Sequence, residues 1–410
     1  MMPADAKSVL AYEQAPDGIV GVELRLDGRS VSGLKIFPLT VAIGVARVRV
    51  DGIGNVSTDD GYRGQGYARR VLDAAVGWMR RGEHPAPTGP AAFSFLFGIR
   101  NFYERFGYAP AGPEVSLRMM ALCGSGPSTR ELSVAGWRVR RCEPADLPTL
   151  IALYERSIAH SVAAVVRATD GRVWTTLASI AEDPSRDECR VVVDPSGAVV
   201  GYAWRGQDFW AVDTEDETPD ALTIAEAVAL EPASSDAVLA ACRDWAVEES
   251  ARRPQLTQVK VYLPPNGTLY AAAARQDTEA KTAWRATGEF MARTLDVELA
   301  LRSVAAELTQ RVRAARQTAA GTLRLETDAG VATLEIEADQ VSVRAADNLR
   351  EPPTATVELA QQDLTRLVLG TFPVDDALDR LSLPADPTAR RWLEVLFPQR
   401  HPYVHPPDRI

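Results

Sequence analysis

The stretch IGNVSTDDGYRGQGYA, residues 53–68, decides how the first part of the chain folds. Its apolar start predicts the end of a β-strand, the chain then turns at Arg63, Gly64 and Gly66, and a helical pattern follows. Glycine allows close approach to the backbone, and the unpaired N–H groups at the amino end of a helix attract anions. Because Arg63 stands beside them, these groups predict a pyrophosphate site.

The flanking sequence predicts a sheet covered by a helix. Residues 18–56 contain the β-type runs VGVELRL, LKIFPLTVAI and ARVRV, separated by the turn signals DGR and DGIG, which indicates an antiparallel sheet rich in hairpins. FSFLFG predicts a further strand after the helix. The apolar positions of the helix recur at helical spacing and predict one stripe against the sheet: Val71, Leu72, Ala75, Val76 and Met79.

A dinucleotide-binding fold is the alternative for the same glycines. Gly64 and Gly66 follow a strand, and Glu83 stands near the distance of a ribose-binding acid. However, Arg69 occupies the place of the third glycine, and hairpins rather than a parallel crossover precede the motif. The sequence therefore disfavours this alternative.

A second motif supports another fold. The spacing R-x-x-G-x-A at Arg63, Gly66 and Ala68 resembles the acyl-CoA pyrophosphate loop of the GNAT N-acetyltransferase superfamily. The segment LFGIRNFYERFGYAPAG, from Leu96, resembles the strand of that family and its helix with N-x-Y, which ends in a G-Y turn. We interpret the first part of the chain as a GNAT unit on the agreement of the two motifs.

The resemblance implies that acetyl-CoA is the co-substrate and that no metal takes part. Tyr103 would protonate the leaving CoA thiolate, although a packed aromatic ring is its alternative role. A phenol titrates near 10 and a thiol near 8.5, so the site would have to assist this transfer. The remaining implied acetyl-CoA contacts are the backbone of Val56, Ser57 and Thr58, the loop residues Arg63, Gly64, Gln65, Gly66, Tyr67, Ala68 and Arg69, and Gly98 and Ile99.

A second unit follows a polar linker, GSGPSTRELS, at residues 124–133. The runs WRVRR, CRVVV, AVVGYAW, LTIAEAVAL and TQVKVYL predict its strands, and two helical patterns, one holding residues 147–154 and one over residues 236–249, lie among them. This order repeats the first unit and indicates an internal duplication. The junction after LTIAEAVAL reads EPASSDAV, without arginine or glycine, and Glu231 would repel a pyrophosphate. We therefore expect a degenerate copy that acts as scaffold.

A third unit completes the chain. The runs TLRLET, VATLEIE, QVSVR and ATVELA predict strands, and three helical segments follow them. The three-part order is similar to the Eis-like (enhanced intracellular survival) acetyltransferases, which implies an α/β (α+β) architecture of tandem GNAT folds with mixed, mainly antiparallel sheets. The implied domains are a catalytic GNAT domain at 1–123, a degenerate one at 134–295 and a sterol-carrier-like domain at 296–410.

The resemblance also assigns a role to the chain end. In that family the terminal carboxylate enters the active site as general base, and the matching residue here is Ile410. Other candidates for the base are His401, His405 and a water path, and a frayed tail is the alternative for residues 401–410. The chain before the first motif is short for the family, so the acceptor side is expected to be abbreviated.

Composition narrows the partners. With 45 basic and 55 acidic residues the net charge is −10, which disfavours nucleic acid and fits a cationic or small neutral ligand. The four cysteines, Cys123, Cys142, Cys189 and Cys242, form no CxxC pair, which argues against a zinc site and for free thiols. No export signal and no run of about 18 apolar residues is found, so we expect no membrane insertion and a cytoplasmic location.

The sequence thus predicts an acetyl-CoA-dependent N-acetyltransferase acting on a primary amine, either an aminoglycoside-like polyamine or a lysine-type amine. The resemblance implies a homo-oligomer, with a hexamer among the options. The alternative is a non-catalytic protein that binds a lipid or another small molecule on the same folds. The identity of the acceptor amine does not follow from the residues.

Overall fold

The computed structural model describes residues 8–82, 89–121, 129–206, 219–316, 320–337, 339–345, 352–381 and 386–410. Its chain divides into two compact units. Unit 1 consists of Met1–Gly112, Arg285–Pro402 and Ile410, and unit 2 of Pro113–Trp284 and Tyr403–Arg409. Glu83, Cys123 and residues 124–128 of the predicted linker lie outside the described residues.

Unit 1 begins with the predicted hairpin-rich sheet, which is confirmed. Its strands are β1 Ser8–Gln14, β2 Val20–Leu26, β3 Arg29–Ile43, β4 Ala46–Thr58, β5 Phe93–Gly98, β6 Ala109–Gly112 and β15 Glu289–Thr294. They lie in the order β1-β2-β3-β4-β5-β15-β6. All neighbours are antiparallel except β4 and β5, which run parallel because a helix connects them.

One of the two predicted turns in this sheet is wrong. DGR forms the expected turn, with Asp27 and Gly28 at φ 46° and 85°. DGIG does not turn: Gly52 and Gly54 lie inside β4 and pair with Phe37 and Lys35 of β3. Their φ values are not positive, so glycine is needed here for space above the strand rather than for a turn.

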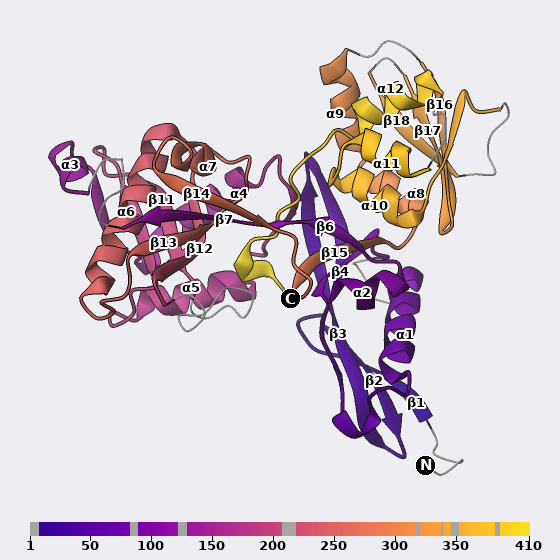
Figure 1. Cartoon of the computed structure of the whole chain (residues 1–410), viewed down its shortest axis with the longest axis horizontal. Helices are drawn as coiled ribbons and strands as arrows, with labels where there is room; N and C mark the ends of the chain where they lie inside the picture. The colour runs from indigo at the N-terminus through magenta and orange to yellow at the C-terminus, as the bar shows by residue number, and fades with distance from the viewer. Residues whose placement is uncertain are drawn as a thin grey trace. The chain divides into compact units, whose positions relative to one another are not determined.

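The helix α1 Tyr67–Arg81 covers one face of this sheet, as predicted (Figure 1). Alternate residues of β2, from Val20 to Leu26, are buried beneath it. Each fully buried side chain of this size contributes about 1.5–3 kcal/mol. The five predicted stripe residues are all buried: Val71, Leu72, Ala75, Val76 and Met79.

The carboxy-terminal part of unit 1 has its own sheet, in the order β18-β17-β16-β19. The strands are β16 Gly321–Thr327, β17 Gly330–Ile336, β18 Val341–Ala345 and β19 Ala355–Glu358. The helices are α8 Val297–Ser303, α9 Ala305–Ala315, α10 Gln361–Leu369, α11 Val374–Leu381 and α12 Pro387–Leu396. Two helices rather than one, α8 and α9, precede this sheet, because the chain leaves helical geometry at Val304 (φ −103°, ψ 3°).

Unit 2 contains a sheet in the order β14-β7-β13-β12-β11-β10-β8. Its strands are β7 Glu114–Met120, β8 Arg138–Arg141, β10 Cys189–Val193, β11 Val199–Arg205, β12 Ala221–Ala229, β13 Gln258–Tyr262 and β14 Thr278–Ala283, and β9 Val162–Val165 is a short extra strand segment. The helices are α3 Thr129–Val134, α4 Leu147–Ser157, α5 Arg172–Glu182, α6 Pro232–Ser250 and α7 Thr268–Ala273. The five predicted strands are confirmed. The other elements of this unit were not predicted: β7, β9, β14, α3, α5 and α7. Of these, α3 begins inside the segment predicted as a polar linker.

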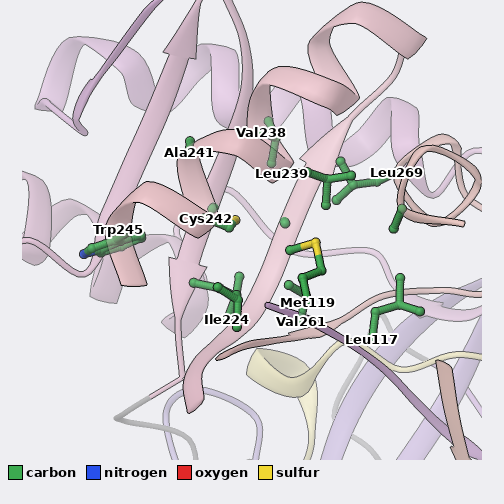
Figure 2. Close-up of a cluster of buried hydrophobic side chains, with 14 of the residues drawn as sticks. Leu117, Met119, Ile224, Val238, Leu239, Ala241, Cys242, Trp245, Val261 and Leu269 are labelled. Atoms are coloured by element: carbon green, nitrogen blue, oxygen red, sulfur yellow. The ribbon is translucent and has the colours of Figure 1, made fainter. Parts of the chain in front are cut away.

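The core of unit 2 lies between α6 and the sheet (Figure 2). Val238, Cys242 and Trp245 of α6 meet Leu117 and other side chains of the strands there. The helix begins four residues earlier than predicted, because Pro232 occupies its first turn, where the missing N–H costs nothing.

Each of the two large sheets contains one strand that comes from the neighbouring part of the sequence. β7 inserts between β13 and β14 of unit 2, and β15 inserts between β5 and β6 of unit 1. The compact units therefore differ from the predicted ranges 1–123 and 134–295 at both boundaries. The exchange gives each sheet the same arrangement around its parallel strand pair.

Among the described helices, none is long and apolar enough to cross a membrane. Cys142, Cys189 and Cys242 are buried free thiols. Within the described ranges, no group of three or more His, Cys, Asp or Glu side chains is placed to hold a metal ion.

Candidate functional site

The site begins where the parallel strands β4 and β5 separate. Their pairing runs from Val50 with Phe93 to Ile53 with Leu96. Beyond Ile53, β4 continues on β3 as far as Thr58 across a bulge at Asn55, whose φ is 54°. The β5-facing edge of the last residues of β4 is therefore outside the ladder that joins the two strands.

The alternation of the backbone determines which amides face this opening. The N–H of Asp59 donates to the carbonyl oxygen of Val31 on β3 at 3.0 Å. Since peptide groups alternate along a strand, the N–H groups of Val56 and Thr58 point to the opposite side. The amide of Ser57 lies on the β3 side, and the Ser57 carbonyl oxygen accepts a hydrogen bond from the hydroxyl of Ser32 at 3.0 Å.

The loop after β4 leaves the amino end of α1 open. Gly64 and Gly66 have φ values of 75° and 79°, and a Cβ at either position would meet no atom within 4 Å. Gly66 is the residue that precedes the helix, so no side chain caps the N–H groups of Tyr67, Ala68 and Arg69. The first turn also lacks an acidic residue. This geometry suits an anion.

Two polar side chains of the loop, Arg63 and Gln65, bond to neighbouring groups. The Arg63 side chain is 72% exposed, lies 2.9 Å from the carboxylate of Asp60 and donates from Nε to the Thr58 carbonyl oxygen at 3.4 Å. Because an exposed ion pair of this kind contributes little, Arg63 is free to turn toward a bound anion. Gln65 donates to the Gly61 carbonyl oxygen at 3.3 Å.

Tyr103 lies at the end of α2 Arg100–Tyr103, a shorter helix than expected, which the 3-10 helix Glu104–Phe106 extends. The Tyr103 side chain is buried, and its hydroxyl forms no hydrogen bond with any residue that the structure describes. Burial raises the pKa of Tyr103. A Cβ at Gly98 would lie 2.3 Å from the Tyr103 ring, so only glycine fits at position 98.

An ion pair that sequence reasoning missed holds the start of α2. The Arg100 guanidinium donates from Nε to the buried carboxylate of Glu289 on β15 at 2.6 Å and makes a second, short contact from Nη2. The Arg100 N–H also donates to the carbonyl oxygen of Ala286. Glu289 follows Arg100 by almost 200 residues and matches no motif, so no sequence signal pointed to it. The neighbouring Ile99 is 51% exposed.

The chain end packs on β4. A Cβ at Gly52 would lie 1.8 Å from Cδ1 of Ile410, and a Cβ at Gly54 would lie 3.2 Å from the carboxyl carbon of Ile410. The two glycines therefore make room for the side chain and the carboxylate of the last residue. Their spacing in DGIG was the available signal, which the sequence analysis attributed to a turn.

The register of the strands places both groups at the same end of the parallel ladder. Gly54, on which the Ile410 carboxyl group lies, follows Ile53 directly. Gly98, on which the Tyr103 ring packs, lies two residues after Leu96. Ile53 and Leu96 are the last pair of the parallel ladder. Both groups thus border the end of the parallel ladder, Tyr103 in the core on the α1 side of the sheet and Ile410 on the other face. Of the alternative bases, His401 is exposed and His405 belongs to unit 2.

Residues 3–111 match the family model of the GNAT acetyltransferase domain. No curated protein matches the chain in sequence.

Solved structures resemble nearly the whole chain at low identity. A GCN5-related N-acetyltransferase from Anabaena variabilis superposes with a TM-score of 0.68 and 17% identity over 95% of this chain and 89% of that chain. One from Kribbella flavida gives 0.64 and 19% over 95% and 87%. Eis1 from Mycobacterium abscessus gives 0.57 and 17% over 94% and 90%.

These likenesses confirm the predicted α+β fold with three mixed, mainly antiparallel sheets, which matches multi-domain GNAT structures. The amino-terminal region is a GNAT acetyltransferase domain, and the protein is an N-acetyltransferase of the kind that uses an acyl-CoA. Its loop and its amide-bearing strand lie within the matched residues.

Proposed function

We propose that the protein transfers the acetyl group of acetyl-CoA to a primary amine at the end of the β4–β5 ladder. The observation that carries this proposal is the uncapped amino end of α1, which residues 59–66 join to a strand that extends beyond the parallel ladder. The same unit holds the buried Tyr103, whose hydroxyl has no partner among the described residues. The helix amino end can bind an anion, and the β4 amides can donate hydrogen bonds to a reacting carbonyl oxygen.

In this proposal, the loop holds the pyrophosphate. The N–H groups of Tyr67, Ala68 and Arg69 point out of the first turn of α1, and the helix dipole favours the negative charge. Arg63 leaves Asp60 and pairs with the phosphates. Gln65 and the two glycines complete the loop because they place no bulky group over it.

The N–H groups of Val56 and Thr58 then stabilise the thioester oxygen as negative charge develops on it. The amine nitrogen bonds to the carbonyl carbon while the carbon–sulfur bond breaks. Tyr103 donates its proton to the leaving thiolate, and the proton lost by the amine passes through water to the carboxylate of Ile410. Burial keeps Tyr103 protonated throughout the neutral range, which suits an acid.

The acceptor in this proposal is a cationic amine. The net charge of −10 favours a cationic amine, either an aminoglycoside-like polyamine or a lysine-type amine. Among described residues 8–66 there is no α-helix, and β1 joins β2 through a tight turn at residues 15–19.

We also propose the finer assignments that rest on resemblance: an Eis-like protein with a sterol-carrier-like carboxy-terminal domain, a cytoplasmic location and a homo-oligomer, with a hexamer as one option. The order of the three parts and the whole-chain likeness to Eis1 support the first of these.

The test is release of CoA from acetyl-CoA with a panel of amines, comparing the native chain, Tyr103→Phe and a chain extended by several residues after Ile410. We expect turnover with at least one cationic amine and a loss in both variants. Turnover that survives the extension would move the base away from Ile410. Absence of turnover with every amine would favour the alternative, a binding protein without catalysis.

A further inference from the structure

Unit 2 contains a cavity of about 200 Å³ that the sequence analysis did not anticipate. It lies at the carboxyl ends of the parallel strands β12 and β13, and the end of α4, the start of α7 and the tail residue His405 complete its wall. Pockets for drug-sized ligands hold roughly 300–1,000 Å³, so this cavity suits a smaller molecule.

The cavity exists because the two strands separate early. β12 and β13 pair only from Ala221 with Gln258 to Ile224 with Val261. β12 continues to Ala229 along β11, whereas β13 ends at Tyr262 and the chain turns away. The β13-facing edge of the last residues of β12 therefore borders the cavity instead of a strand.

Backbone groups point into this opening. The hydroxyl of Thr268 donates to the carbonyl oxygen of Ala229 at 2.9 Å, which shows that the Ala229 peptide group faces the cavity side. Because peptide groups alternate along a strand, the N–H and C=O of Ala227 face the same side. A strand edge of this kind pairs with an amide of a ligand, as in the addition of an extended peptide to a sheet.

The polar side chains of the wall favour a negative charge. Arg156, in the last turn of α4, is exposed and forms no ion pair with any described residue. None of the described residues that line the cavity is acidic. The remaining wall is mostly apolar, with Val228, Leu263 and Leu269 among its members.

A buried imidazole faces the same space. His405 is 4% exposed, and its Nδ1, which lies 3.4 Å from Oε2 of Glu226, has no hydrogen-bond partner among the described residues. Burial lowers the pKa of His405, so the ring is neutral near pH 7. Because Nδ1 is covered, the ring gives the cavity an uncharged piece of wall.

A nucleotide does not fit here. α6 starts two residues after β12, and Pro232 in its first turn has no N–H to offer. The carboxylate of Glu231, just before the helix, would repel phosphates. The ligand therefore carries a single weak anion rather than a pyrophosphate.

We propose that this cavity binds a small carboxylate that also carries an amide, such as an N-acylated amino acid. Its amide pairs with the Ala227–Ala229 edge of β12, its carboxylate meets Arg156 at the mouth, and its aliphatic part packs on the apolar wall. The proposal stands apart from the acetyl transfer in unit 1, because none of the residues that carry it belongs to that site.

Isothermal titration of the full-length protein with N-acetyl-L-leucine tests this. We expect saturable binding, about tenfold weaker in Arg156→Gln because a hydrogen bond to a charged group is lost. N-acetyl-L-leucinamide, which lacks the carboxylate, should show the same loss on the native chain. Arg252→Gln, a matched change of an exposed arginine outside the cavity, should leave binding unchanged.

Two results would overturn the proposal. One is no saturable binding of N-acetyl-L-leucine, or equal binding by the native chain and Arg156→Gln. The other is loss of binding in Arg63→Gln with full binding in Arg156→Gln, since that would place the ligand at the α1 loop. Both outcomes are independent of turnover, so a failure of the proposed function would be recognised separately in the CoA-release assay.

Discussion

The chain contains two junctions in which a long strand leads into a helix beside a parallel neighbour, and they differ in length. In unit 1, residues 59–66 separate β4 from α1, whereas in unit 2 only residues 230–231 separate β12 from α6. The longer connection includes Gly64 and Gly66 in the left-handed region. The length difference determines whether a ligand can reach the helix end.

The junctions also differ in what occupies the helix amino end. α1 starts after a glycine that caps nothing, with no acid in its first turn. α6 starts after Glu231, carries Pro232 in its first turn and has Ser234 hydrogen-bonded to the backbone of Glu231. One helix end is left free for an anion, and the other is closed by the chain itself.

Both strand pairs nevertheless separate in the same way. The ladder between β4 and β5 stops at Ile53, and the ladder between β12 and β13 stops at Ile224. In unit 1 the chain end lies on Gly52 and Gly54 beside the opening, and in unit 2 the opening borders a cavity. Both units therefore have an opening beside a parallel strand pair, whereas only the junction in unit 1 has the long glycine loop.

The largest expected effect concerns the acid of unit 1. Tyr103→Phe should lower kcat by about 10²–10⁴-fold, because the thiolate would leave unprotonated. Burial raises the pKa of Tyr103, so native kcat should fall on the alkaline side only above about pH 10, the value of a free phenol. A pH–rate profile of both proteins measures this. A fall in native activity between pH 7 and 9 that Tyr103→Phe retains would exclude this role.

In unit 2 the largest effect should be a loss of stability when a buried ion pair is broken. Arg167 contacts Asp408 at 2.8 Å and Glu226 at 2.5 Å, and its guanidinium lies 3.7 Å from the centre of the Tyr154 ring. Arg167→Met leaves two buried carboxylates without their cation, which should cost about 3–5 kcal/mol. Thermal unfolding measures the loss, and carboxypeptidase should release the last residues faster.

Arg252→Met, at an 83% exposed side chain, serves as the control for that change and should have almost no effect. Unchanged unfolding of Arg167→Met would show that the cluster around Asp408 contributes nothing to stability.

A smaller effect is expected at the loop of unit 1. Gly66→Val places a β-branched residue at φ 79°, where it is strained, and should weaken binding of CoA about tenfold. Gly197→Val is the matched control, because Gly197 also has a left-handed φ, 92°, and open space around it but lies in a turn of unit 2. Titration with CoA compares them. Equal loss in both variants would mean that general destabilisation is responsible.

The smallest effect concerns pH and His405. Glu226, Arg167, Asp408 and Arg409 surround this ring, and burial lowers its pKa in the folded state. The unfolded chain therefore binds more protons as pH falls through about 6.5, so stability decreases from pH 7.5 to 5.5. Melting temperatures of the native chain and His405→Gln measure this. A decrease of equal size in both would assign the pH dependence to other groups.

The sequence predicted the elements best where the pattern was local. The α1 stripe and the glycine loop depend on residues close in sequence, and both are found as expected. The prediction was wrong where a residue distant in sequence explains the pattern. Gly52 and Gly54 predicted a turn, but they lie within a strand on which Ile410 packs.

The same reasoning explains what was missed at the site and in unit 2. Glu289 supports Arg100 from a strand that reaches the first sheet only through the exchange of β15, which no local pattern encodes. The cavity of unit 2 depends on where a parallel ladder ends, a property of strand register rather than of composition. Periodicity predicts elements, whereas openings between them depend on long-range pairing.

The central claim is that only the junction of unit 1 binds the pyrophosphate of an acyl-CoA. Titration of CoA into the native chain, Arg63→Gln and Glu231→Gln tests it directly. We predict one CoA per chain, about tenfold weaker binding in Arg63→Gln and no change in Glu231→Gln. Two CoA molecules per native chain, or full affinity in Arg63→Gln, would contradict the claim.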